Sequence, residues 1–259
     1  MNDLHDFPDV AENYDFYVNA ISTYKDRGWE RFYLKLAKTY GAGGVIDIAC
    51  GTGVLAVPLA KKGFDVTACD ISEAMVAVTR RKLEAAGLSA PVFAADMTDF
   101  DAGRQFSLAI IARSGFMHLT APAQQRRCLL TIKKHLLPGG VLTLNTFQPW
   151  PQAQAEQMDA GPDDYTLRVE YVNAKGQRER IYNAIGYDLD TQIMRGSWKF
   201  ETLDNAGRVI DTRVRPIAMR QTYTQEMKYL CELCGFEVVE CERRGEVGGH
   251  LIWLLKNPA

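Results

Sequence analysis

The feature that most constrains this chain is a short apolar run that ends in a glycine-rich turn. The run Val45-Ile46-Asp47-Ile48 is rich in β-branched residues and predicts a buried strand. Gly51 and Gly53 then allow the backbone to turn sharply and to approach a ligand closely, because neither carries a Cβ atom. The apolar residues after Gly53 predict a helix whose first N–H groups face that ligand. Together they predict the first strand–turn–helix unit of a doubly wound α/β sheet.

The acids beside this turn constrain the ligand. Gly51-x-Gly53-x-x-Ala56 also fits the loose fingerprint of dinucleotide-binding turns. A carboxylate at Asp47 would repel a pyrophosphate, whereas it suits a ligand that carries an ammonium or sulfonium group. Asp70 ends the next expected strand, where an acid accepts hydrogen bonds from ribose hydroxyls. These residues predict a cationic nucleoside as the ligand and disfavour the alternative, an NAD-dependent oxidoreductase.

Strands and helices alternate along the chain, which predicts a parallel sheet with helices on both faces. Ligands of such sheets bind beyond the carboxyl ends of the strands, where Asp47, Asp70, Asp96 and Arg113 are all expected. The expected strands are residues 45–48, 64–69, 92–95, 106–112 and 141–147, followed after an interruption by 236–240 and 250–255. The expected helices are residues 29–40, 54–62, 73–86, 122–137 and 224–234.

Four motifs in this order resemble those of the class I S-adenosylmethionine (SAM)-dependent methyltransferases. They are Asp47-x-Ala49-Cys50-Gly51-Thr52-Gly53, Asp70, Ala95-Asp96-Met97 and Leu137-Pro138-Gly139-Gly140. The resemblance covers about residues 40–147, and the last forty residues more loosely. It implies a mostly parallel, seven-stranded Rossmann-like sheet with an antiparallel final strand. It also implies SAM as cofactor and S-adenosyl-L-homocysteine as product.

We expect this cofactor to be held at the strand ends. Asp96 is expected to bind the adenine amino group, and Ile71 and Met97 are expected to sandwich the ring. Each of these three can instead be a helix cap or a core residue. The expected cofactor-binding residues are Asp47, Ala49, Gly51, Thr52, Gly53, Asp70, Ile71, Asp96, Met97 and Arg113.

Methyl transfer from a sulfonium is a one-step displacement, which needs orientation but no metal or covalent intermediate. A base is needed only where the nucleophile arrives protonated. His118, just past the fourth strand, is the first candidate base; the alternative is a histidine that caps or packs against the next helix. Tyr14 is the second candidate, and it can instead hold the methionyl part of SAM. Tyr17, Phe116 and Arg220 are expected to contact the substrate.

Residues 149–223 interrupt the α/β alternation with a period-two pattern and turn sequences, which predict an antiparallel meander of about four strands. Trp198 and Phe200 share one face of it, so we expect this insertion to cover the acceptor cleft, to form a homodimer contact, or both. The insertion resembles that of small-molecule N-methyltransferases that act on amino sugars and amino acids. The expected divisions are an N-terminal lid or helix (1–40), a SAM-binding core (41–148), the insertion (149–223) and a C-terminal helix with a β-hairpin (224–259).

The net charge and the sequence after the fourth expected strand give no indication of a nucleic-acid or membrane partner. The net charge of −2 gives nothing to attract nucleic acid or an anionic membrane. Ala112-Arg113-Ser114-Gly115 also stands where nucleic-acid amino methyltransferases carry an Asn/Asp-Pro-Pro-aromatic motif. An acidic N-terminus and the lack of a long apolar run predict a soluble, cytoplasmic protein.

The remaining alternatives concern metal and catalysis. Cys231-x-x-Cys234 is expected to be a buried apolar pair on a helix, because no second pair or suitably spaced His accompanies it. No metal site is expected. The sequence therefore predicts a SAM-dependent enzyme with a small-molecule acceptor, and the alternative is a SAM-binding sensor or scaffold without catalysis.

Overall fold

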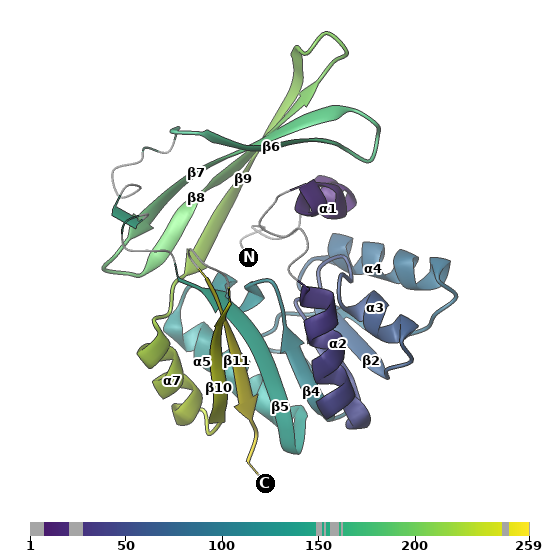
Figure 1. Ribbon diagram of the computed structural model, residues 1–259, viewed down its shortest axis with the longest axis vertical. Coiled ribbons are helices and arrows are strands. Elements are labelled where there is room, and N and C mark those ends of the chain that lie inside the picture. The colour runs from purple at the N-terminus through teal and green to yellow at the C-terminus, as the bar shows by residue number, and fades with distance from the viewer. Residues whose placement is uncertain are drawn as a thin grey trace. The chain divides into compact units, whose positions relative to one another are not determined.

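The protein divides into two compact units, each described here by itself. The computed structural model describes residues 8–20, 28–148, 152, 154–155, 161, 163–244 and 249–258. The core unit is formed by the described parts of Gly28–Pro149 and Arg220–Ala259, and the insert unit by those of Met1–Arg27 and Trp150–Met219. Figure 1 shows the parallel sheet of the core unit and the separate antiparallel sheet of the insert unit.

In its described residues, the core unit contains a seven-stranded sheet with the order β10-β11-β5-β4-β1-β2-β3. The neighbours from β5 to β3 pair in parallel, whereas β11 is antiparallel to both β5 and β10. The predicted mostly parallel sheet with an antiparallel final strand is therefore confirmed. The strands are β1 (Val45–Ile48), β2 (Val66–Asp70), β3 (Val92–Ala94), β4 (Phe106–Ile111), β5 (Leu136–Phe147), β10 (Glu237–Arg244) and β11 (His250–Lys256).

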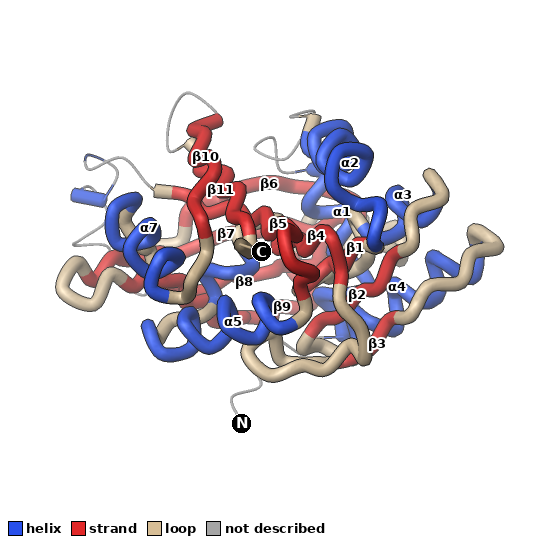
Figure 2. Tube along the Cα trace, turned by 90° about the horizontal axis from the view of Figure 1, so that it is seen from below, coloured by secondary structure: helices blue, strands red, loops and turns tan. Residues whose placement is uncertain are grey.

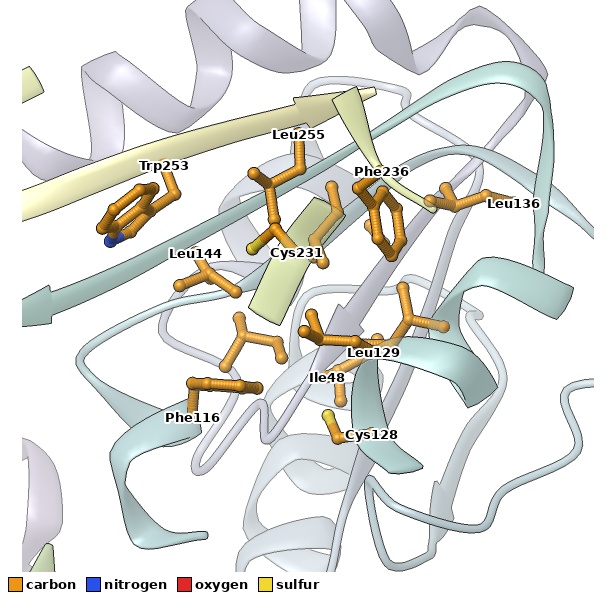
Figure 3. Close-up of a cluster of buried hydrophobic side chains, with 14 of the residues drawn as sticks. Ile48, Phe116, Cys128, Leu129, Leu136, Leu144, Cys231, Phe236, Trp253 and Leu255 are labelled. Atoms are coloured by element: carbon orange, nitrogen blue, oxygen red, sulfur yellow. The ribbon is translucent and has the colours of Figure 1, made fainter. Parts of the chain in front are cut away.

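Helices cover both faces of this sheet, because each face is apolar. One core joins α5 and α7 to the sheet and includes the fully buried Phe116, Leu129 and Trp253 (Figure 3). The other core lies under α2, α3 and α4 and includes Tyr33 and Leu59. Figure 2 shows α5 and α7 on one side of the sheet and α2 and α3 on the other. The helices are α2 (Trp29–Tyr40), α3 (Ala56–Lys61), α4 (Glu73–Ala85), α5 (Pro122–Lys134) and α7 (Thr224–Leu233), with the 3-10 turns η1 (Gly41–Gly43) and η2 (Gly115–His118).

The start of β5 differs from the expectation from sequence. The strand begins at Leu136 instead of Val141, and α5 ends earlier, at Lys134. The pairing with β4 shifts register, so that Phe106 faces Leu136 and Leu108 faces Val141. The Pro138-Gly139-Gly140 stretch, expected between the helix and the strand, is thus an irregular segment inside the strand. This irregular segment needs a φ of +77° at Gly139, which glycine adopts easily because it has no Cβ atom.

The insert unit is the expected meander, with four antiparallel strands in the order β6-β7-β8-β9. Trp198 and Phe200 lie on one face, as predicted, and Tyr17 of the helix α1 (Pro8–Ala20) packs on that face beside them. Asp9 of α1 forms ion pairs with Arg213 and Arg215 of β9. Part of the apolar face of this sheet therefore packs against α1. The strands are β6 (Thr166–Val172), β7 (Arg178–Asp188), β8 (Ile193–Leu203) and β9 (Val209–Arg220).

Among the described helices, none combines the length and the apolar character that a membrane crossing requires.

Candidate active site

The turn after β1 has left-handed backbone conformations at three residues, of which Gly51 and Gly53 were expected to allow a sharp turn. Ala49, Gly51 and Gly53 adopt positive φ angles of 56°, 56° and 75°. A Cβ atom on Gly53 would lie 2.8 Å from Thr79 Cγ2, so this glycine allows the loop to pack against α4. A Cβ atom on Gly51 would meet nothing within 4 Å. Gly51 therefore presents its backbone on the open side of the loop, where a ligand can approach it.

Side chains of β2 and α4 fix this loop in place. Asp70 accepts hydrogen bonds from the backbone N–H of Gly51, at 2.8 Å, and from that of Ser72, at 3.0 Å. Thr79 Oγ1 donates to the Gly51 carbonyl at 2.8 Å, and Lys82 Nζ donates to the Thr52 carbonyl at 2.8 Å. These hydrogen bonds join the loop to β2 and α4 and so pre-organise it for a ligand. Asp70 thus has a structural role in addition to the predicted ribose contact.

Asp47 is the most perturbed acid of the site. Asp47 is 1% exposed, and this burial raises the pKa of its carboxyl to about 7. A hydrogen bond from the Ala56 N–H lowers the pKa, whereas the charge of Asp70 raises it further. Its Oδ2 atom has no hydrogen-bond partner among the described residues. A buried carboxylate in this position is poorly compensated when ionised. A cationic ligand group beside it would supply the missing partner, so the residues present fit a SAM-like cofactor.

The ends of β2 and β3 carry the residues expected around the adenine ring. Ile71 follows Asp70 directly and leaves 49% of its surface exposed, so its apolar side chain is accessible at the end of β2. Met97 is half-buried and packs against the core. Asp96 is exposed, and its Oδ1 accepts a hydrogen bond from the Thr98 N–H at 2.7 Å, so it also caps its own turn. Because β2 and β3 are neighbours, the structure brings these four residues to one edge of the sheet.

The segment after β4 lies against the glycine loop. Arg113 and Ser114 both adopt left-handed conformations, with φ of 53° and 62°, which cost roughly 1 kcal/mol or more per residue without glycine. A Cβ atom on Gly115 would come within 3.2 Å of Ala49 Cβ, so the two loops touch. His118 ends η2 and is half-buried. The candidate base thus lies on a short turn that begins beside the glycine loop.

Phe116 has a different place from the one expected. Its side chain is fully buried among the other apolar side chains of the core (Figure 3). We therefore assign it to packing and leave it out of the proposed site.

The other expected acceptor residues have partners within their own units. Tyr17 packs its ring edge-on against Tyr171 and Phe200, with centroid distances of 6.4 and 6.0 Å, and Tyr14 contacts Tyr17 at 5.2 Å. Arg220 forms an ion pair with Glu226 at 3.1 Å. The substrate and cofactor roles of Tyr14, Tyr17 and Arg220 stay predictions.

The cysteine pair is structural, as interpreted from the sequence. Cys231 and Cys234 of α7 and its C-terminal end are buried, and burial raises the pKa of Cys231 to about 12. Thiols that stay protonated in an apolar core are poor metal ligands and poor nucleophiles. Within the described residues, no group of three or more His, Cys, Asp or Glu side chains is arranged to hold a metal ion.

Some residues of the site were not found from the sequence. Thr79 and Lys82, three positions apart on one face of α4, both bind loop carbonyls. Their spacing was the available signal, but it also fits an ordinary helix surface. Asn145 of β5, which hydrogen-bonds to Ser114, carried no signal beyond a polar residue in an apolar strand.

One surface depression lies elsewhere in the core unit. It has a volume of about 540 Å³ and is lined by residues that include Arg127, Lys133, Leu136 and Pro138. Leu136 and Pro138 lie at the start of β5, at the edge opposite to the carboxyl ends of the parallel strands, and Arg127 and Lys133 belong to α5. This depression is therefore distinct from the candidate site.

Comparisons with known proteins agree with this geometry. Residues 45–140 match a family model described as a methyltransferase domain. A dTDP-3-amino-3,4,6-trideoxy-alpha-D-glucopyranose N,N-dimethyltransferase of Streptomyces venezuelae is 30% identical over 143 residues, which are 55% of this chain and 57% of that protein. A demethylmenaquinone methyltransferase of Thermus thermophilus is 30% identical over 148 residues, 56% of this chain and 66% of that protein. The solved structure of a SAM-dependent methyltransferase from Clostridium acetobutylicum has a TM-score of 0.77 at 15% identity, and covers 94% of this chain and 96% of that one.

The chain spans between 47% and 66% of the length of the first curated relatives that it matches. The matched segment contains the glycine loop and the acids at the ends of β1, β2 and β3. Residues 45–140 therefore form a methyltransferase domain, and the chain has the fold of the SAM-dependent methyltransferases.

Proposed function

We propose that this protein binds SAM and transfers its methyl group to a small-molecule acceptor by direct in-line displacement. The observation that carries the proposal is Asp47, a buried acid beside the glycine loop with an unsatisfied oxygen and a pKa raised to about 7. In an NAD-binding site this acid would lie near the pyrophosphate of NAD, and the two negative groups would repel each other. The sensor alternative shares the binding site, and only turnover separates it from an enzyme.

The chain's residues divide the work of binding. The open backbone at Gly51 accommodates the methionyl part, Asp47 balances its positive charge, and Asp70 accepts hydrogen bonds from the ribose. The exposed Ile71 supplies an apolar surface for the adenine ring. When bound, SAM supplies an electrophilic methyl group on a sulfonium.

The same residues explain how the reaction is accelerated. The fixed loop orients the methyl donor, and orientation alone can supply effective molarities of about 10⁵ M or more. His118 accepts the proton of a protonated nucleophile, such as an ammonium nitrogen. This assigns a chemical role to a half-buried histidine next to the loop.

For the acceptor we propose an amino sugar, methylated on nitrogen. The support is the 30% identity to an enzyme named for a dTDP-3-amino sugar, together with the antiparallel insertion that resembles those of small-molecule N-methyltransferases. A second candidate acceptor is a quinol ring, methylated on carbon. The similarity to a demethylmenaquinone methyltransferase at the same identity favours it.

A transfer assay with methyl-labelled SAM tests the proposal. The intact protein is incubated with dTDP-3-amino sugars, with a demethylated menaquinol and with no acceptor, and labelled products are identified by mass. Label on the sugar nitrogen supports the amino-sugar proposal, and label on the ring carbon moves the assignment to the quinol. If SAM binds and neither class is methylated, the proposed acceptor classes are wrong, and the sensor alternative gains support.

A further inference from the structure

A buried polar network lies next to the loop that carries His118. Ser114 and Asn145 are 3% and 2% exposed, and they connect the carboxyl ends of β4 and β5. The Ser114 N–H donates to Asn145 Oδ1 at 3.0 Å, and Asn145 Nδ2 donates to Ser114 Oγ at 3.0 Å. Asn145 Nδ2 also lies 3.2 Å from Nδ1 of His250, the first residue of β11.

The hydrogen bonds fix the orientation of the amide. A backbone N–H can only donate, so the atom of Asn145 that faces it must be the oxygen. The other terminal atom is therefore the NH₂ group, and its two hydrogens serve Ser114 Oγ and His250 Nδ1. His250 Nδ1 must then accept a hydrogen bond. This holds the imidazole in the neutral form with its proton on Nε2, because a proton on Nδ1 would set two donors against each other.

Two aromatic rings hold the plane of this imidazole. Trp29 meets His250 edge-on with a centroid distance of 5.4 Å, and Phe147 does so at 6.3 Å. The His250 side chain stays half-buried. Since β11 runs antiparallel to β5, His250 pairs with Phe147, at the carboxyl end of β5. It therefore lies at the edge of the sheet where the candidate site is.

The network is continuous with the cofactor loop. Ser114 is one of the two left-handed residues after β4, and Gly115 next to it lies against Ala49 of the glycine loop. Asn145 thus satisfies both a strained backbone segment and a histidine.

We propose that His250 positions the acceptor in the methyl-transfer site as a neutral Nε2–H donor, and that Asn145 is the positioning residue that sets this tautomer. The proposal rests on the proposed function. The two histidines at this edge then divide the work: His118 accepts a proton, and His250 donates a hydrogen bond. The acceptor group that fits such a donor is an oxygen, such as a hydroxyl, carbonyl or phosphate oxygen.

The tautomer is tested first, without any assay of activity. Long-range ¹H–¹⁵N correlation spectra of the ¹⁵N-labelled protein distinguish the two neutral tautomers, and the four histidines of the chain are assigned with single His→Gln variants. His135 is an internal reference of opposite type, because its Nδ1 faces the Thr131 carbonyl at 2.9 Å and must carry a proton. We expect Nε2–H for His250 and a protonated Nδ1 for His135. A spectrum with Nδ1 of His250 protonated overturns the proposal.

Asn145→Asp tests the cause of the tautomer. The aspartate still accepts from the Ser114 N–H, but it presents an oxygen instead of an NH₂ group to His250, so we expect the proton of His250 to move to Nδ1. Ser114→Ala is the matched control, since it removes Oγ but leaves the amide orientation intact, and it should keep Nε2–H. An unchanged His250 signal in Asn145→Asp shows that Asn145 does not set the tautomer and overturns its role.

Two variants of His250 separate positioning from packing. His250→Gln retains an acceptor for Asn145 and an N–H donor, whereas His250→Phe retains the ring packed against Trp29 and Phe147. We expect the acceptor KM to rise about tenfold or more in His250→Phe and at most about threefold in His250→Gln, with the SAM Kd unchanged in both. The reverse order means that the ring only packs, and overturns the proposal. Absence of methyl transfer by the unaltered protein refutes the proposed function instead, and the tautomer spectra still report on the network.

Discussion

Asp47→Asn should make the protein more stable and bind SAM less tightly. Burial of Asp47 raises its pKa from 3.8 to about 7, a difference of about 3 units. Each unit corresponds to about 1.4 kcal/mol, so the ionised side chain costs the folded protein about 4 kcal/mol. The variant replaces that side chain with a neutral one of the same shape, and Ala56 can still donate to its oxygen. Such a conflict between stability and binding is typical of functional sites.

The dependence on pH follows from the direction of the shift. Below about pH 4 the carboxyl is protonated in both the folded and the unfolded chain, and the variant gains nothing. Between about pH 4 and 7 the unfolded chain loses the proton while the folded chain keeps it, so the cost of Asp47 grows with pH. Above about pH 7 the cost is constant. The difference in the free energy of unfolding between variant and original protein should therefore rise across this window and then level off.

Urea unfolding at several pH values, with and without SAM, measures both effects. Glu84→Gln is the matched control, because it removes one charge from an exposed side chain of α4 in the same unit. SAM affinity of the unaltered protein should fall by up to tenfold per pH unit below about pH 7, and that of Asp47→Asn should be weaker and nearly flat there. The reasoning is refuted if Asp47→Asn is less stable than the original protein at about pH 8, or if it binds SAM equally well.

Further predictions concern the loop, the base and the insert unit. Asp70→Ala should weaken SAM binding more than tenfold in a calorimetric titration, because it removes charge-assisted hydrogen bonds of about 1.5–3 kcal/mol each to the ligand and to Gly51. Thr79→Val removes only one hydrogen bond that holds the loop, so it should weaken SAM binding a few-fold at most in the same titration. His118→Ala should lower kcat with the SAM Kd unchanged, and a parallel loss of thermal stability would indicate packing instead. The intact protein should be a dimer by light scattering, and replacement of residues 165–215 by a short linker should make it monomeric. A monomeric intact protein would contradict the dimer, whereas a deletion variant that is still dimeric would place the interface outside the insertion.

The sequence predicted the parts of the fold that depend on local patterns. The β-branched run before Gly51 predicted β1, and the period-two pattern after residue 165 predicted the four strands of the insert unit. Ser72 precedes α4 and is of a residue type that commonly caps helices, and its Oγ accepts a hydrogen bond from the Met75 N–H at 3.2 Å. These features are set by residues close in the chain, so a local pattern is enough to find them.

The rest depended on contacts between residues far apart in the chain. The packing of α1 on the insert sheet is set by Asp9 and by Arg213 and Arg215, about two hundred positions later, and no period in the sequence records it. The partners of Asp70 were missed for a related reason. An acid at a strand end predicts a ligand, but the backbone N–H groups that also face it appear only when the chain is folded.

The central claim is that the site at the ends of β1, β2 and β3 binds SAM, and calorimetric titration of the intact protein with SAM and with NAD tests it most directly. We expect one SAM to bind per chain, with an affinity that falls in both Asp47→Asn and Asp70→Ala, and no binding of NAD. Binding of NAD by the intact protein, or no binding of SAM at all, would contradict the account.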